Sequence, residues 1–160
     1  MNRLLVVIGV LLSSFSYAGL HTYSEHSVLK EGQFLKVSVK ETGVHMMTYE
    51  QLKSWGLNPA QLRILGYGGG MLSENFTKHH WDDLPPVAFY MHKGTDNVFN
   101  SGDYILFYAQ GPVTWQCNER GLWQHTQNPY SQYGYYFVSD NEAMQRIIPM
   151  SDTRYNEANA

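Results

Sequence analysis

Within residues 33–40, the side chains from Leu35 onward alternate between apolar and polar. Leu35, Val37 and Val39 fall on one face of this segment, and Lys36, Ser38 and Lys40 fall on the other. A period of two is typical of a strand with one buried face. A Glu-Thr-Gly turn follows, and the chain then resumes an extended pattern at residues 44–47. We therefore predict two strands that pair as a hairpin.

A short helix is predicted directly after this pair of strands. Thr48 is followed three positions later by Gln51, which is a capping-box pattern. Residues 49–55 supply one or two helical turns, and Gly56 stands where a left-handed C-cap residue belongs.

The rest of the chain alternates short extended segments with clusters of Gly, Pro, Asn and Asp. An Asn-Pro pair at 58–59 predicts one further helical turn that leads into a strand at 63–65. Further strands are expected at residues 87–92, 104–108, 122–126, 135–139 and 143–148. Many short strands at turn-length spacing predict an all-β fold, an antiparallel β-sandwich with one or two short helices.

The first residues carry the pattern of an export signal. A positive start precedes an apolar run at 4–12, and Ser16 and Ala18 place small residues where a signal peptidase acts. The run is shorter than the ~20 residues that a membrane-spanning helix needs. We predict a signal peptide at 1–18, one β-sandwich domain at 19–150, and a linker or truncated end at 151–160.

Composition narrows the class of protein. The formal charge is only -3 and lysine or arginine runs are lacking, so the attraction on which nucleic-acid binding relies is missing. The 12 Tyr, 7 Phe and 4 Trp suit pleated sheet better than a helix bundle. Cys117 is the single cysteine and cannot form an internal disulfide, so stability must come from packing.

Cys117 and His125 raise the question of a nucleophilic pair. Reactive cysteines lie beside helix N-termini or cationic groups that lower the thiol pKa, whereas residues 115–118 look like a strand end or loop. We interpret the thiol as structural or incidental.

Two stretches are rich in metal-ligand side chains. Residues 79–83 read His-His-Trp-Asp-Asp, but neighbours on an extended chain point to opposite faces and cannot close on one ion. Residues 96–103 place oxygen side chains around a glycine, without the helix-loop-helix pattern of calcium sites. We interpret the first as a solvated loop and the second as a hairpin loop before Tyr104, with a structural ion at Asp96–Asp103 left open.

Two further clusters have alternative interpretations. The glycine-rich residues 66–70 lack the Lys-Ser/Thr of a phosphate loop, so a sharp turn or bulge at a sheet edge is predicted. The aromatic residues at 130–137 suit either a sugar-binding platform or a sheet core. No catalytic, cofactor-binding or metal-ligating residue is assigned, and no cofactor is expected.

Five short sequence motifs are distinctive, at residues 39–44, 65–70, 91–94, 100–112 and 125–130. Together they resemble the N-terminal region of the PorU sortases of the type IX secretion system, a family of gingipain-like cysteine peptidases. The motif Gly-Asp-Tyr-Ile-Leu-Phe-Tyr-Ala is the most specific part of this resemblance. The resemblance extends over residues 27–140 and implies a β-sandwich similar to the gingipain pro-domain.

The resemblance also implies a function for a parent protein. Members of the family remove C-terminal secretion signals from exported cargo and attach the cargo to lipopolysaccharide, with a Cys/His pair in a later α/β domain. Neither Cys117 nor a histidine here corresponds to that pair. We expect a non-catalytic domain in the periplasm or at the outer membrane and surface of a Gram-negative cell. Its expected partners are the peptidase domain of the same parent and other type IX secretion components. The alternative is a stand-alone carbohydrate-binding or adhesion module.

Overall fold

The structure, a computed structural model, describes residues 23–141 with the exception of residues 76 and 79. The predicted signal peptide at 1–18, the predicted strand at 143–148 and the predicted linker at 151–160 lie outside the described residues. Within the described part of the chain, no helix is long and apolar enough to cross a membrane.

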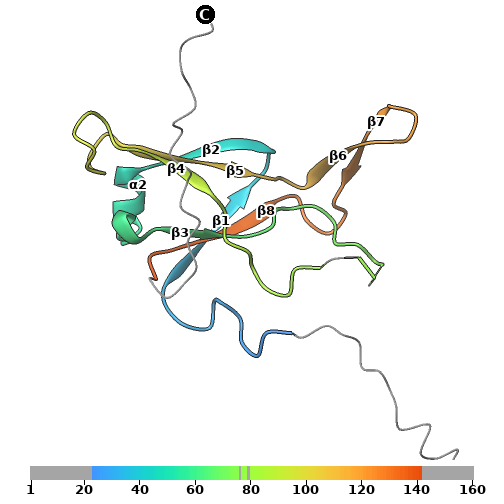
Figure 1. Ribbon diagram of the computed structural model, residues 1–160, viewed down its shortest axis with the longest axis horizontal. Helices are drawn as coiled ribbons and strands as arrows, with labels where there is room; N and C mark the ends of the chain where they lie inside the picture. The colour runs from blue at the N-terminus through green and yellow to red at the C-terminus, as the bar shows by residue number, and fades with distance from the viewer. Residues whose placement is uncertain (1–22, 76, 79, 142–160) are drawn as a thin grey trace, which may run out of the picture.

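The described residues form short strands with two short helical segments between the second and third strands. In chain order these are β1 (Phe34–Val39), β2 (Gly43–Thr48), α2 (Tyr49–Ser54), η1 (Pro59–Gln61), β3 (Arg63–Leu65), β4 (Phe89–His92), β5 (Tyr104–Ala109), β6 (Val113–Cys117), β7 (Trp123–Gln127) and β8 (Gly134–Ser139) (Figure 1). Each of these strands pairs in antiparallel orientation. The predicted all-β class is confirmed.

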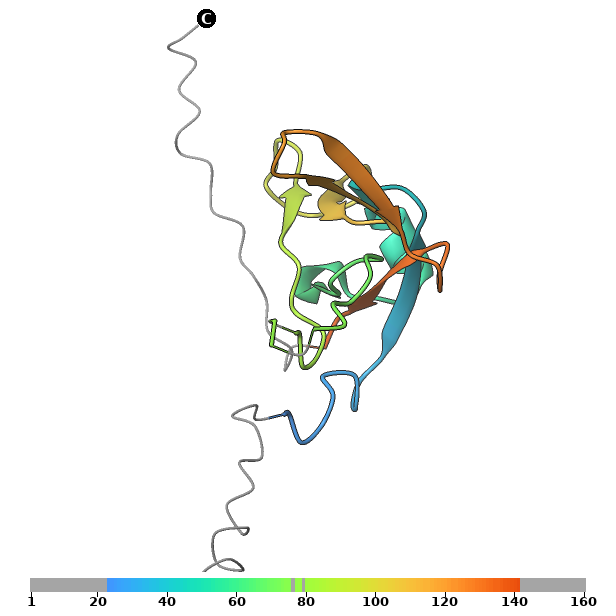
Figure 2. The ribbon, with the colours of Figure 1, turned by 90° about the vertical axis from the view of Figure 1, so that its right-hand side faces the viewer.

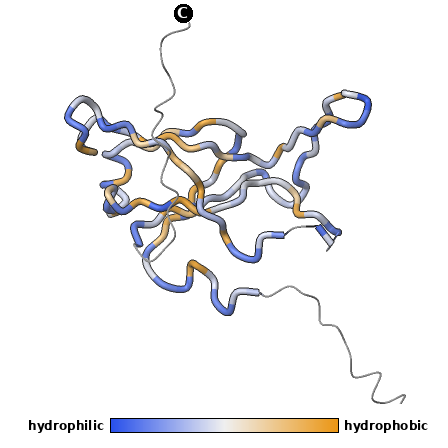
Figure 3. Tube along the Cα trace, viewed as in Figure 1, coloured by the Kyte–Doolittle hydropathy of each residue, from blue (hydrophilic) through white to orange (hydrophobic). Residues whose placement is uncertain are grey.

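The strands form two three-stranded sheets and one two-stranded ribbon. The sheets have the orders β1-β8-β3 and β2-β5-β4, and β6 pairs with β7 alone. Side chains from both sheets meet in one core, where the rings of Phe107 on β5 and Tyr136 on β8 have centroids 5.7 Å apart. Leu52 and Leu62 close the core from the helical side. Figure 3 shows the hydrophobic positions gathered at this centre and the hydrophilic ones along the outer loops.

The predicted pairing of the first two strands is wrong. β1 pairs with β8 and β2 pairs with β5, so the chain passes from one sheet to the other at residues 40–42. The crossing is fixed by a distant segment, because the Gly111 N–H donates to Thr42 Oγ1 at 3.0 Å. Alternating hydrophobicity predicts a strand and its buried face, but it carries no information on which strand lies beside it.

The local signals for the helical segments are confirmed. Thr48 Oγ1 accepts the Gln51 N–H at 3.2 Å, and the Gln51 side chain accepts the Thr48 N–H at 3.0 Å, which completes the capping box. Gly56 follows with φ at 78°. Asn58 caps η1 by accepting the Ala60 N–H.

The strand predictions from residue 87 onward agree with the structure, apart from the segment outside the described residues, and one strand was not anticipated. β4, β5, β7 and β8 lie within or overlap the predicted segments. β6 is the strand that was not predicted: residues 115–118 were interpreted as a strand end or loop, although Val113–Cys117 alternates between apolar and polar side chains.

Candidate functional site

The glycine-rich segment after β3 passes through a crowded crossing of three chain segments. Gly66 and Gly68 have φ of 151° and 96°, conformations that side chains rarely adopt. The Gly69 N–H donates to the Gln110 carbonyl at 3.0 Å, and a Cβ at Gly69 would lie 2.7 Å from Gly134 Cα. The predicted sharp turn is therefore confirmed, at the end of edge strand β3.

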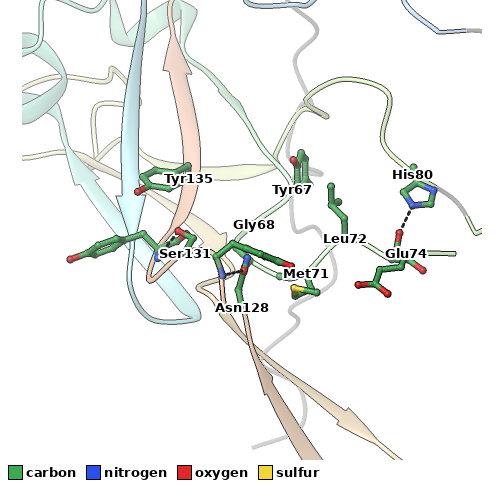
Figure 4. A pocket seen from close by; sticks show the side chains of 14 residues that line it. Tyr67, Gly68, Met71, Leu72, Glu74, His80, Asn128, Ser131 and Tyr135 are labelled. Atoms are coloured by element: carbon green, nitrogen blue, oxygen red, sulfur yellow. Dashed lines mark hydrogen bonds between the residues drawn. The ribbon is translucent and has the colours of Figure 1, made fainter. Parts of the chain in front are cut away.

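A cleft of about 580 Å³ opens beside this crossing (Figure 4). Residues 67–74 and His80 line it on one side, and residues between 128 and 135 line it on the other. The crossing connects the two sides, because the Asn128 side-chain amide donates to the Gly69 carbonyl at 2.9 Å. The cleft is thus built by segments about sixty positions apart in the sequence.

The polar side chains of one side mainly shape the backbone. Asn128 Oδ1 accepts the Tyr130 N–H at 2.9 Å, so both ends of this amide are engaged. Ser131 Oγ donates to the Tyr133 carbonyl and accepts the Tyr133 N–H. These bonds fold residues 128–133 into a tight loop and engage the Ser131 hydroxyl in holding it.

His80 closes the other side of the cleft. Its Nδ1 lies 2.7 Å from the Lys78 carbonyl oxygen. Its Nε2 lies 2.8 Å from the Ser73 carbonyl oxygen (Figure 4). The ring therefore bridges the backbone at residues 73 and 78 and braces the loop.

The aromatic cluster at 130–137 divides between the cleft and the core. Tyr136 is buried, whereas Tyr130 is 85% exposed. Tyr133 and Tyr135 are tilted at 48° with centroids 6.4 Å apart, and Lys36 Nζ lies 3.8 Å from the centre of the Tyr135 ring. Tyr136 therefore confirms the sheet-core interpretation, whereas a sugar-binding use of the exposed tyrosines stays a prediction.

Cys117 and His125 lie on the β6–β7 ribbon and face the same way. Cys117 is opposite Trp123, and His125 is opposite Trp115 with ring centroids 5.1 Å apart. The thiol is exposed, and its only described polar contact is Asn118 O at 3.7 Å. No hydrogen bond joins the two side chains, so the geometry is not that of a nucleophile with its base.

The aspartates of the loops at 82–83 and 96–103 accept hydrogen bonds from backbone N–H groups. Asp96 accepts the Val98 N–H at 3.0 Å and Asp103 accepts the Asn100 N–H at 2.8 Å, which confirms the predicted hairpin loop between β4 and β5. Asp82 and Asp83 accept backbone N–H groups of the segment at 24–28. Within the described ranges, no three His, Cys, Asp or Glu side chains are arranged to hold a metal ion.

Glu50 connects helix α2 to the β4–β5 loop. Its Oε1 accepts the Ser101 hydroxyl at 2.7 Å and the Gly102 N–H at 2.9 Å. These hydrogen bonds favour the carboxylate and lower the pKa of Glu50 from 4.5 to about 2.

We expect Glu50→Gln to make the melting temperature of the domain fall less as the pH is lowered. Because the folded pKa is depressed, the contribution of Glu50 is present above pH 4.5 and is lost as the pH falls toward 2. The melting temperature of the Gln variant should lie below that of the wild type at pH 7 and should approach it near pH 2. Ser101→Ala, which removes one donor, should give an intermediate curve. Parallel curves for wild type and Glu50→Gln between pH 7 and pH 2 would contradict the assignment.

Comparison with known proteins gives a match among solved structures. No family model matches the chain, and no curated protein is significantly similar to it. A solved structure, the dimeric latent PorU from Porphyromonas gingivalis, is 38% identical and superposes with a TM-score of 0.62. The match covers 74% of this chain and 10% of the PorU chain. The chain therefore contains a PorU-related region and spans about a tenth of the length of that protein.

Proposed function

We propose that this chain is an exported, non-catalytic domain of a PorU-like sortase of the type IX secretion system. The observation that carries the proposal is the 38% identity to PorU over 74% of the chain. In such a parent, a gingipain-like peptidase domain removes C-terminal secretion signals and attaches cargo to lipopolysaccharide. The present domain supports that peptidase domain and contacts other secretion components at the outer membrane.

The chemistry of the described residues is consistent with a supporting role. Cys117 and His125 do not form a pair, and the polar groups of Asn128, Ser131 and His80 are engaged in shaping the cleft. Asp96 and Asp103 are likewise committed to their own loop. A domain with these features supplies a surface, and the reaction belongs to the remainder of the parent.

The size of the native polypeptide tests this proposal. Antiserum raised against residues 27–140 should detect, in outer-membrane fractions of the native cells, a band several times larger than 18.4 kDa. A strain lacking the gene should lose that band. A single band at or below 18.4 kDa would overturn the proposal, because a peptidase domain could not be part of the same chain.

A second candidate function is carbohydrate binding in the cleft. Tyr130 presents an open aromatic face there, and the Glu74 carboxylate has no hydrogen-bond partner among the described residues. Aromatic rings suit the apolar faces of sugars, and a carboxylate accepts hydroxyl groups. On a glycan array, Tyr130→Ala should weaken any retained glycan roughly fivefold. Tyr90→Ala, at the exposed position of β4 and outside the cleft, is the control. Equal glycan binding by both variants would exclude the cleft as the carbohydrate-binding site.

A further inference from the structure

The β6–β7 ribbon has one aromatic and one polar face. In its register Val113 lies opposite Gln127, Trp115 opposite His125, and Cys117 opposite Trp123. Directly opposed residues point to the same side of an antiparallel pair, and successive residues point to alternate sides. Trp115, Trp123, His125 and Cys117 therefore share one face. The other face carries two pairs, Thr114 with Thr126 and Gln116 with Gln124.

The aromatic face lacks a covering element among the described residues. The ribbon belongs to neither three-stranded sheet and extends away from the body of the domain (Figure 1). Figure 2 looks at the molecule from the ribbon side. All five residues of β7 are exposed, and Trp115 and Trp123 are 60% and 68% exposed. Neither indole N–H makes a hydrogen bond within the described part of the chain.

An isolated two-stranded hairpin is marginal in water, and large exposed aromatic side chains mark interaction sites. Tryptophan is also the side chain most enriched among residues that dominate binding energy. The ribbon thus has the features of a docking element: an exposed aromatic face, a polar opposite face and a position outside both three-stranded sheets.

We propose that the aromatic face of this ribbon docks against another folded domain of the same polypeptide. The inference rests on the proposed function, in which this unit is one part of a longer parent. The occupant offers an apolar surface with carbonyl or carboxylate acceptors for the two indole N–H groups.

The size of the face argues for a tethered occupant over a second copy of the chain. A tryptophan side chain has at most about 250 Å² of surface, so the two indoles together expose roughly 300 Å². A stable interface between separate proteins buries about 800 Å² on each partner. A domain linked by the chain is present at an effective concentration in the millimolar range, so a smaller face suffices.

Hydroxyl-radical footprinting of the purified parent polypeptide tests the docking. Trp81 provides a matched reference, because it is the same side chain, is 54% exposed and lies outside the ribbon. In the folded parent we expect oxidation of Trp115 and Trp123 to be at least about fivefold slower than oxidation of Trp81. In urea the three rates should be equal. Equal rates in the folded parent would overturn the docking.

Dilution and a pair of variants separate the tethered occupant from the alternatives. Protection that persists on tenfold dilution supports an intramolecular contact, whereas protection lost on dilution assigns the face to a second copy and overturns the proposal. With a protease site inserted after residue 150, cleavage removes the tether, so the cleaved domain should stay bound only at high protein concentration and should separate on dilution. At high concentration Trp115→Gln with Trp123→Gln should release it, and Gln116→Ala with Gln124→Ala should not. Release by both pairs, or by neither, would contradict the assigned face.

Failure of this inference is distinguishable from failure of the proposed function. A small native polypeptide on the immunoblot removes the proposed parent, whatever the reactivity of the indoles. A large parent with freely reactive Trp115 and Trp123 leaves the proposed function standing and removes the docking face.

Discussion

Gly134→Ala is expected to lower the free energy of unfolding by about 3 kcal/mol. A Cβ at this position would lie 2.2 Å from the Gln110 carbonyl oxygen and 2.9 Å from the Gly69 nitrogen. Both are backbone atoms and cannot rotate aside as a flexible side chain would. The start of β8 must therefore shift away from the crossing that supports the cleft.

Gly43→Ala is the matched control for this substitution. Gly43 also begins a strand, but a Cβ there would meet no heavy atom within 4 Å and its φ is not positive. Its free energy of unfolding should stay within about 0.5 kcal/mol of the wild type. Urea denaturation followed by tryptophan fluorescence measures both variants. Equal stabilities for Gly134→Ala and Gly43→Ala would show that the crossing is looser than the structure has it.

The sequence predicts elements whose signals are local. The capping box at Thr48 and Gln51, the left-handed Gly56 and the alternating β1 each depend on residues within a few positions of one another. These features were predicted correctly because the hydrogen bonds or the buried face that define them form within one short segment. The same holds for the turn chemistry of Asp96 and Asp103.

Pairing and the cleft depend on contacts that no local pattern reports. The partner of β1 is β8, a hundred positions away in the sequence, and a hairpin was predicted because neighbouring strands most often pair. The cleft unites Tyr67 with Tyr130 through the close approach of Gly69 and Gly134. Glycine composition predicts that such an approach occurs, but it does not say which segments meet.

Tyr135 and Tyr136 point to opposite sides of β8, and they show what hydrophobic periodicity can and cannot predict. Adjacent strand residues face opposite sides, so one of the two had to be buried once β8 was recognised. Tyr136 is the buried one, because it lies opposite Val37 on β1 and packs against Phe107 across the core. Contacts with the second sheet decide which face of β8 looks into the core, because the sequence of β8 alone places large apolar side chains on both faces.

Tyr136→Phe is expected to lower the free energy of unfolding by about 1–3 kcal/mol. The Gln110 N–H donates to the Tyr136 hydroxyl at 2.7 Å, and phenylalanine would leave that half-buried donor without its acceptor. Gln110 also accepts the Gly69 N–H through its carbonyl, so the lost bond weakens the same crossing. Tyr135→Phe is the control, because its hydroxyl makes no hydrogen bond among the described residues, and it should change stability by less than about 0.5 kcal/mol.

Alkaline pH provides a second measurement of the same hydroxyl. Burial raises the pKa of Tyr136 above its usual value of 10. The contribution of the neutral phenol is therefore complete below pH 10 and is lost as the pH rises above it. Wild type and Tyr135→Phe should share this alkaline loss of stability, while Tyr136→Phe should lose less between pH 9 and pH 11. An equal alkaline loss of stability in Tyr136→Phe would contradict this assignment, because it would mean that another group causes the loss.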